Sequence, residues 1–312
     1  GARIGGVVMA DRSTFTGPVN ADGMEVGDSL FLRDMPSVAE VRLLGAKIGG
    51  QVAANGSTFT GLFNADGMEV GGDLFLRDMP SVAEVDLLGA KIGGDVSANR
   101  STFTGLFNAD SIEIGGYLFL RDMPSVAEVD LLGAKIGRNV EADGATFTGL
   151  VTADGMEVGG SLFLRDMEGA QDLDLSGIRV GQGVQLRGSA IAGAVDLTGA
   201  EIGGALELWQ RNSEVAWQEG AALILRNASA GALQARMPES WRVAGTGAPI
   251  PYDLQGFAYD RLGGATSGAD HDLARSNDAG ALVDWLRAER PPGMADVTAY
   301  GPQPYRQLAD VL

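Results

Sequence analysis

Apolar residues in the first two thirds of the chain recur in pairs separated by one residue. The pairs in one stretch are Val52/Ala54, Phe63/Ala65, Leu74/Leu76 and Val85/Leu87, with single apolar residues between them at Ile48, Phe59 and Val70. A period of two within each pair is typical of short strands with one face turned toward a core. The short steps between pairs predict four sides per coil of a repeating structure, with a three-sided coil as the alternative.

A 22-residue unit repeats along residues 1–209. Its copies begin at Gly1, Gly23, Gly45, Gly67, Gly89, Ser111, Gly133, Gly155, Gly177 and Gly199. The third residue of the unit is charged and changes sign at every copy, as in Arg3, Glu25 and Lys47. Stacked coils bring such side chains within about 5 Å of one another, where opposite charges stabilise the pairing and like charges repel. The alternation therefore predicts one coil per 22 residues.

Side-chain size also alternates from coil to coil. Ala10 is followed at 22-residue intervals by Leu32, Ala54 and Leu76. The alanine coils carry Phe15, Phe59, Phe103 and Phe147, and Ser37, Ser81 and Ser125 lie 22 residues after the first three. Large side chains stacked on small ones fill a narrow interior without voids. The 44-residue unit is therefore predicted to be two interlocking coils, with the serines above the phenylalanines.

The paired inward residues at near-five spacing resemble those of pentapeptide-repeat proteins over residues 1–209. This resemblance implies a right-handed, four-sided β-helix. The chain departs from that family because four sides of a 22-residue coil average 5.5 residues, and because the A-[DN]-L-x-x signature is missing. The predicted fold is all-β, a right-handed β-solenoid of about ten coils with a small C-terminal helical cap.

The repeat breaks after Leu208, and the rest of the chain is predicted to form two further segments. Residues 210–265 are expected to be degenerate terminal coils with loop insertions. Within them, 210–220 is predicted to be an inserted loop, 222–233 one more coil and 253–262 a final strand.

Residues 266–312 are expected to form helices that cap the solenoid. Leu282, Trp285 and Leu286 have helical spacing and precede two prolines, which predicts a helix over 278–290 and a second over 303–312. An open coil is a template for strand pairing, so solenoids need capped ends.

Two C-terminal phrases, GFAYDRLGG at 256–264 and PQPYRQLADVL at 302–312, are similar to those of a bacterial β-solenoid family whose members are often labelled membrane-associated oxidoreductases. The resemblance implies that the tail continues into more helix and a membrane segment. Both ends of the chain look cut, so membrane association is expected only through residues outside this chain.

The charge balance narrows the classes of partner. The chain has 23 Lys+Arg against 41 Asp+Glu, a net charge of −18. Such acidity repels phosphate backbones and anionic lipid, which argues against direct nucleic-acid or membrane-surface binding. Cysteine is absent, so no disulfide framework or cysteine-based metal site is expected. These properties fit a cytoplasmic location, or the inner face of a membrane if the tail is anchored.

No cofactor or metal site is predicted. The nearest match to a dinucleotide fingerprint is Gly181-Gln182-Gly183, but no helix follows it. Gly93-Gly94 and its equivalents are interpreted as corner glycines that permit positive φ. The single histidine, His271, has only its sequence neighbours Asp270 and Asp272 as acidic partners, which favours a solvated loop over a metal site or a catalytic triad.

Two acidic pairs and a threonine ladder are weaker candidates. The pairs Asp172/Asp174 and Asp166/Glu168 have the spacing for glycoside cleavage, but a solvated acidic rung without an aromatic groove is the preferred interpretation. Outward threonines would resemble an ice-binding ladder, and they are Thr14/Thr16, Thr58/Thr60, Thr102/Thr104 and Thr146/Thr148. Pro80 and Val82 interrupt that ladder on alternate coils.

With no catalytic, cofactor-binding or metal-binding residue assigned, the leading hypothesis is a non-catalytic scaffold or recognition rod. Its strand-built faces would bind a protein partner of unknown identity, and they allow end-to-end or side-by-side self-association. The alternative is an acidic DNA mimic that inhibits a DNA-binding enzyme such as a topoisomerase, although the sign-alternating ladder weakens a continuous negative stripe. A solenoid enzyme or an ice-binding protein comes third.

Overall fold

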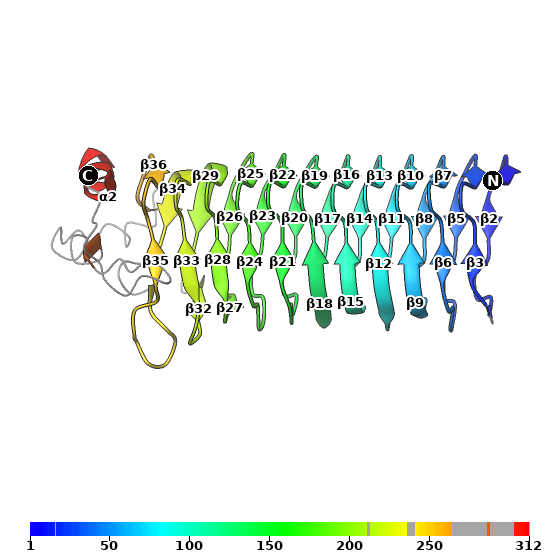
Figure 1. Cartoon of the computed structure of the whole chain (residues 1–312), viewed down its shortest axis with the longest axis horizontal. Coiled ribbons are helices and arrows are strands. Elements are labelled where there is room, and N and C mark those ends of the chain that lie inside the picture. Colours follow the sequence, from blue (N-terminus) through cyan, green and yellow to red (C-terminus); the bar gives the residue numbers. More distant parts are fainter. Residues whose placement is uncertain (16, 211–212, 236–240, 264–285, 288–302, 312) are drawn as a thin grey trace.

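Parallel strands stack along one long axis and form a rod (Figure 1). The computed structural model describes residues 1–263 except 16, 211–212 and 236–240, together with 286–287 and 303–311. Neighbouring coils pair in register 22 residues apart, so that Glu69 lies between Lys47 and Lys91. The chain is therefore a right-handed β-solenoid with the predicted coil length.

Three rows of strands run the length of the rod. The first row, which contains the alternating charges, consists of β1 (Arg3–Ile4), β4 (Glu25–Val26), β7 (Lys47–Ile48), β10 (Glu69–Val70), β13 (Lys91–Ile92), β16 (Glu113–Ile114), β19 (Lys135–Ile136), β22 (Glu157–Val158), β25 (Arg179–Val180), β29 (Glu201–Glu207), β34 (Ser229–Gln234) and β36 (Ala258–Tyr259). The second row consists of β2 (Val8–Met9), β5 (Leu30–Phe31), β8 (Val52–Ala53), β11 (Leu74–Phe75), β14 (Val96–Ser97), β17 (Leu118–Phe119), β20 (Val140–Glu141), β23 (Leu162–Phe163) and β26 (Val184–Gln185). The third row consists of β3 (Val19–Asn20), β6 (Val41–Arg42), β9 (Phe59–Asn64), β12 (Val82–Asp86), β15 (Thr102–Asn108), β18 (Ser125–Asp130), β21 (Val151–Thr152), β24 (Leu173–Asp174), β28 (Ala194–Asp196), β33 (Ala222–Ile224) and β35 (Tyr252–Asp253).

A fourth row of bridges just before the third row completes each coil, and it corrects one expectation. Phe59 pairs with Val38 on one side and Val82 on the other, not with a serine. Val82 is buried whereas Ser81 is half-buried. The register shifts between Val82 and Glu84 because β9 holds one residue more than β12 at this point, at Gly61. A Cβ on Gly61 would collide with the carbonyl oxygen of Ala39, so the bulge needs glycine.

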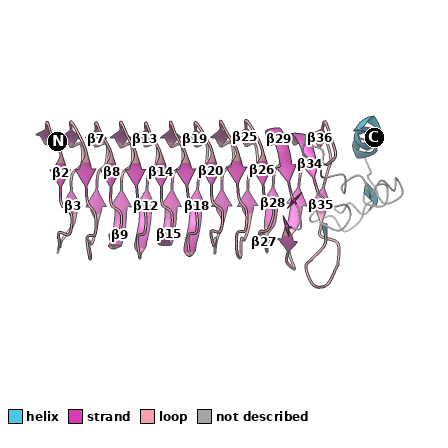
Figure 2. Cartoon of the chain, turned by 180° about the vertical axis from the view of Figure 1, so that it is seen from behind, coloured by secondary structure: helices cyan, strands magenta, loops and turns pink. Residues whose placement is uncertain are grey.

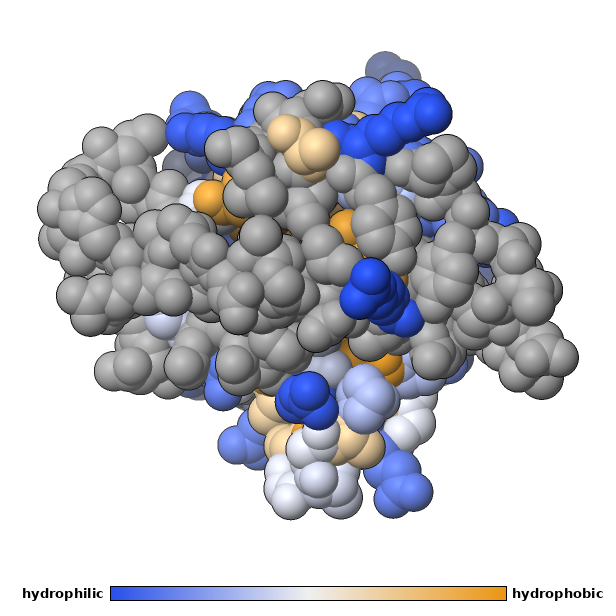
Figure 3. Space-filling view, turned by 90° about the vertical axis from the view of Figure 1, so that its left-hand side faces the viewer, coloured by the Kyte–Doolittle hydropathy of each residue, from blue (hydrophilic) through white to orange (hydrophobic). Residues whose placement is uncertain are grey.

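The interior is a single column of apolar side chains in which size alternates as predicted. Leu32, Ala54, Leu76 and Ala98 are all at most 3% exposed. Each larger side chain thus lies between smaller ones on the neighbouring coils, which is how a narrow core reaches close packing. Seen from the C-terminal end, hydrophobic residues show near the centre and hydrophilic ones around the periphery (Figure 3).

The corner glycines act differently from the prediction. Gly93 and Gly94 form a bend, but neither has positive φ; that conformation occurs at Gly89 (φ 59°), the residue that opens each repeat. A Cβ on Gly93 would lie 2.5 Å from the carbonyl oxygen of Gly71. Glycine is needed at this corner because successive coils approach too closely for a side chain, not because of φ.

Two longer coils follow the 22-residue array. Ser229 pairs with Glu201, 28 residues earlier, and Ala258 with Ser229, 29 residues earlier. The first insertion contains an antiparallel hairpin of β30 (Trp209–Gln210) and β31 (Ser213–Glu214).

The predicted loop over 210–220 is only partly a loop. Its β32 (Ala216–Trp217) returns to the rod and pairs with β27 (Ala190–Ile191), and Trp217 is fully buried. The single strand predicted over 253–262 is instead divided between β35 and β36.

A helix covers part of the C-terminal edge, in agreement with the predicted cap. Helix α2 (Gln303–Val311) lies beside β36 beyond the last coil (Figures 1 and 2). Gln303 accepts a hydrogen bond from the N–H of Gly256 (3.1 Å) and donates to the carbonyl of Phe257 (2.8 Å). Gln307 donates to the carbonyl of Tyr259 (2.6 Å). Of the helix predicted over 278–290, only the helical residues Leu286 and Arg287 fall within the described residues.

Candidate functional site

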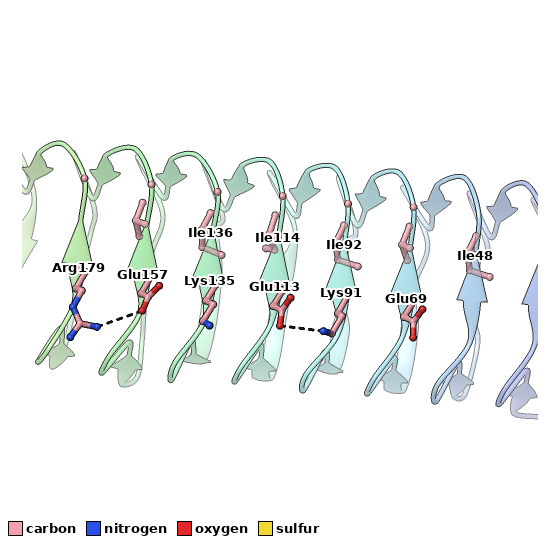
Figure 4. Close-up of a pocket in the computed structure, with 18 of the residues that line it drawn as sticks. Ile48, Glu69, Lys91, Ile92, Glu113, Ile114, Lys135, Ile136, Glu157 and Arg179 are labelled. Carbon is pink, nitrogen blue, oxygen red and sulfur yellow. Dashed lines mark hydrogen bonds and ion pairs between the residues drawn. The ribbon is translucent and has the colours of Figure 1, made fainter.

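A groove with a volume of about 1900 Å³ follows the charged ladder of the first row (Figure 4). Lys47 Nζ lies 2.9 Å from Glu69 Oε1, and Lys91 Nζ lies 3.3 Å from Glu113 Oε1. These side chains are more than half exposed, so each pair contributes little to stability. Along the ladder, cation and anion alternate and neutralise one another, and the groove carries no charge of one sign.

The backbone of this groove offers few free groups to a ligand. The N–H of Gly93 donates to the carbonyl of Val70, and that of Gly94 donates to Gly72, both at ladder distances. Because these N–H groups are already engaged between coils, they cannot cradle an anion or pair with an added strand. The groove therefore stabilises the stack, and its chemistry does not favour one class of ligand.

The outer side of the second row carries a recurrent Phe–Arg stack that inspection of the sequence alone had missed. Arginine lies over phenylalanine on every second coil, with guanidinium carbons 4.2–4.9 Å from the ring centroids, in the pairs Phe31/Arg33, Phe75/Arg77, Phe119/Arg121 and Phe163/Arg165. The recurring phrase Leu-Phe-Leu-Arg-Asp is the signal, since its leucines point inward and its Phe and Arg outward.

Most of these guanidinium groups are paired within the rod. Arg33 binds Asp11, Arg165 binds Asp143 and Arg121 binds Glu141. The hydrogen bond from Arg33 lowers the pKa of Asp11 below its usual value. At the far end of the row, burial raises the pKa of Glu207, and Arg187 opposes that shift.

On one coil the stack is extended by Tyr117 and Arg138. Tyr117 packs on Phe119 with centroids 5.2 Å apart, and Arg138 lies over Tyr117. Both faces of Phe119 are thus occupied by neighbours. A sugar ring needs an open aromatic face, so this row is not a platform for carbohydrate.

The third and fourth rows present a surface of a different kind, which we call the acidic face. It comprises the outward residues of six successive segments: 59–67, 81–89, 103–111, 125–133, 147–155 and 169–177. These segments contain no Lys or Arg, and their acidic residues are Asp66, Glu84, Asp86, Asp110, Glu128, Asp130, Asp154, Asp172 and Asp174. Nine negative charges out of a net −18 therefore lie on one side of the rod.

The carboxylates of the acidic face differ from those elsewhere in lacking cationic partners. Within the described residues none of the nine forms an ion pair, whereas Glu25, Glu69 and Glu113 of the first row do. Asp86 Oδ1 accepts hydrogen bonds from the N–H of Leu88 and from Asn108, which are neutral donors. Glu84 and Glu128 are exposed. The face therefore projects an uncompensated negative field, which steers cationic partners toward it.

Exposed leucines lie on the same face. Beyond the first coil, the large hydrophobic side chains that are exposed in the described residues are Leu44, Leu88, Leu132 and Leu150, at 36–40%. Leu150 is on β-ladder positions of the third and fourth rows, and the other three lie at the turn that ends the face. Exposed apolar side chains gathered in one region mark interaction surfaces. Counting charge segment by segment, in place of the whole chain, is the sequence signal that could have found this face.

The acidic pairs considered for catalysis lie in the turns and ladders of the rod. Asp172 accepts a hydrogen bond from the N–H of Ala194 (2.7 Å), and Asp174 accepts one from the N–H of Ser176 (3.1 Å). Asp166 has positive φ at a corner, and Glu168 begins the next side. The structure gives neither pair a cavity of its own.

The remaining candidates are placed as follows. Gly181, Gln182 and Gly183 follow β25 at a bend of the first-row ladder. The hydroxyl of Thr60 donates to the carbonyl of Val38 (3.3 Å), and Thr104 and Thr148 make the same bond, so these threonines are tied to the preceding coil. His271 and its neighbours lie outside the described residues.

Two further searches and the comparisons with known proteins complete the description. In the part of the chain that the structure describes, no group of three or more His, Cys, Asp or Glu side chains is arranged to hold a metal ion. None of the described helices has the length and apolar character to cross a membrane. No family model, curated protein or solved structure matches the chain.

Proposed function

We propose that the protein is a non-catalytic recognition rod whose acidic face binds a basic protein. The observation that carries this proposal is the separation of charge: acidic residues of the first row are matched by cations of the neighbouring coils, whereas the nine of the acidic face have none. Potentials of one sign on an extended surface select partners of the opposite sign and speed their association. The rigid stack holds the carboxylates at fixed spacing, so little ordering is required on binding.

Site-specific cross-linking tests this function. Because the chain has no cysteine, Glu84→Cys places one thiol on the acidic face and Glu69→Cys places one on the charged ladder. With a photoactivatable cross-linker on each thiol, a basic protein of the host should be captured from position 84 and not from position 69. Capture from both positions, or from neither, would contradict the proposal.

The same face supports the second candidate function, mimicry of nucleic acid toward a DNA-binding enzyme. A surface with nine carboxylates and no cation resembles a phosphate backbone in charge. Duplex DNA added to the cross-linking reaction separates the two functions. If DNA abolishes capture from position 84, the partner uses its nucleic-acid site; if capture persists, the partner is recognised through another basic surface.

A further inference from the structure

The acidic face has a regular spacing along the rod. Glu84 and Glu128 are 44 residues apart, as are Asp86 and Asp130. These residues belong to coils that pair in parallel with the coil between them. Paired strands lie about 4.8 Å apart, so equivalent carboxylates recur about every 9.6 Å along the axis.

Leucines occupy the intervening positions. Leu62 pairs with Glu84, and Leu106 pairs with Glu128. At the turn that ends the face, Leu88 and Leu132 alternate with aspartates of the neighbouring coils. An occupant that lies along the rod therefore meets a carboxylate and an apolar side chain in each repeat of about 9.6 Å.

Few backbone conformations match this repeat. An α-helix rises 1.5 Å per residue, so a heptad spans about 10.5 Å and loses register by about 0.9 Å at each repeat. A strand shows the same side every second residue, at about 6.6 or 13.2 Å. Polyproline II has three residues per turn and spans about 9.3 Å, within about 0.3 Å of the repeat.

We infer that the acidic face binds a basic, proline-rich segment in the polyproline II conformation, with one Lys or Arg at every third residue. This inference rests on the proposed function and names the class of partner. One edge of the three-sided helix presents its cations to the carboxylates, and the prolines on the next edge contact the exposed leucines. Proline suits this face because it has no N–H to satisfy and because the segment is largely ordered before it binds.

Binding of two labelled peptides to the full chain tests the inference. One peptide has four Lys-Pro-Pro repeats; the other has the same composition with its lysines at every second residue. Measured by fluorescence anisotropy at low salt, the first peptide should bind about tenfold more tightly. Equal affinities would overturn the inference, because net charge alone would then explain binding.

Two double variants localise the site. Glu84→Gln with Glu128→Gln should weaken the Lys-Pro-Pro peptide about tenfold, a loss equal to about 1.4 kcal/mol. Glu69→Gln with Glu113→Gln makes the same change of charge on the charged ladder and should leave affinity unchanged. Equal losses in both variants would overturn the proposed site.

The outcomes separate this inference from the proposed function. If position 84 still captures a basic protein while the two peptides bind equally, the recognition rod stands and the polyproline partner is wrong. If position 84 captures nothing and the peptides also bind equally, both proposals fail.

Discussion

Glycines stacked on glycines set how closely successive coils approach. Gly93→Ala is expected to lower the stability of the rod by roughly 1–3 kcal/mol or more, because the new Cβ would lie 2.5 Å from a backbone oxygen that cannot move independently. Gly5→Ala is the matched control: it has the same place in the repeat, but nothing lies within 4 Å of its Cβ. Thermal unfolding followed by circular dichroism should show a clear loss for the first variant only; similar midpoints would contradict this account.

Buried serines fasten one corner of alternate coils. The Ser101 hydroxyl donates to the carbonyl of Leu76 (2.7 Å) and accepts from the N–H of Met79 (3.0 Å), and the side chain is fully buried. Ser101→Ala should cost about 1–3 kcal/mol because it leaves those backbone groups without a partner. Ala145 occupies the equivalent position 44 residues later. Ala145→Ser should therefore raise the unfolding midpoint, and a fall would show that the corner has no room for the hydroxyl.

At the scale of elements, the two ends of the solenoid differ. The first strands β1, β2 and β3 pair only with the following coil, and Ile4, Val7 and Met9 are exposed there. At the other end, α2 contributes amide side chains in place of a further coil. Amide groups suit this task because one side chain both donates and accepts, as an edge strand does.

Removing those amides should open the C-terminal edge. Gln303→Ala with Gln307→Ala leaves the carbonyls of Phe257 and Tyr259 without these donors, and an unpaired edge recruits other strands. We expect concentration-dependent association, measured by size-exclusion chromatography with light scattering. Arg306→Ala, on the exposed side of the same helix, is the control. A double variant that stays in the same state as the control at all concentrations would show that α2 does not protect the edge.

At the scale of the whole molecule, charge is distributed unevenly around the rod. The first row holds alternating charges that attract along the axis, whereas the acidic face holds like charges that repel. Because the repulsion is uncompensated, salt should stabilise the protein: raising ionic strength from about 0.01 M to about 0.15 M shortens the Debye length from about 30 Å to about 8 Å.

The two double variants used for binding should respond in opposite directions. At low salt, Glu84→Gln with Glu128→Gln should raise the unfolding midpoint because it relieves repulsion on the acidic face. Glu69→Gln with Glu113→Gln should lower it because Lys47 and Lys91 lose their partners. Thermal scans at two salt concentrations check both signs. A shift of the same sign in both variants would contradict the separation of charge.

Much of the solenoid could be predicted from the sequence. In a stack with a fixed coil length, the residue 22 positions away is the spatial neighbour, so the period by itself predicted the pairing of Lys47 with Glu69 and the alternation of Leu32 with Ala54. These are consequences of translation along one axis, and they need no knowledge of side-chain detail.

The tertiary structure decided what does not follow from a constant period. The bulge at Gly61 places Val82 beside Phe59 where the spacing predicted Ser81, because local crowding changes the register within a coil. The return of Trp217 to the core depends on the path of an insertion. The acidic face emerged only when outward residues of six coils were brought to one side, since the sum of charges along a chain does not reveal its direction in space.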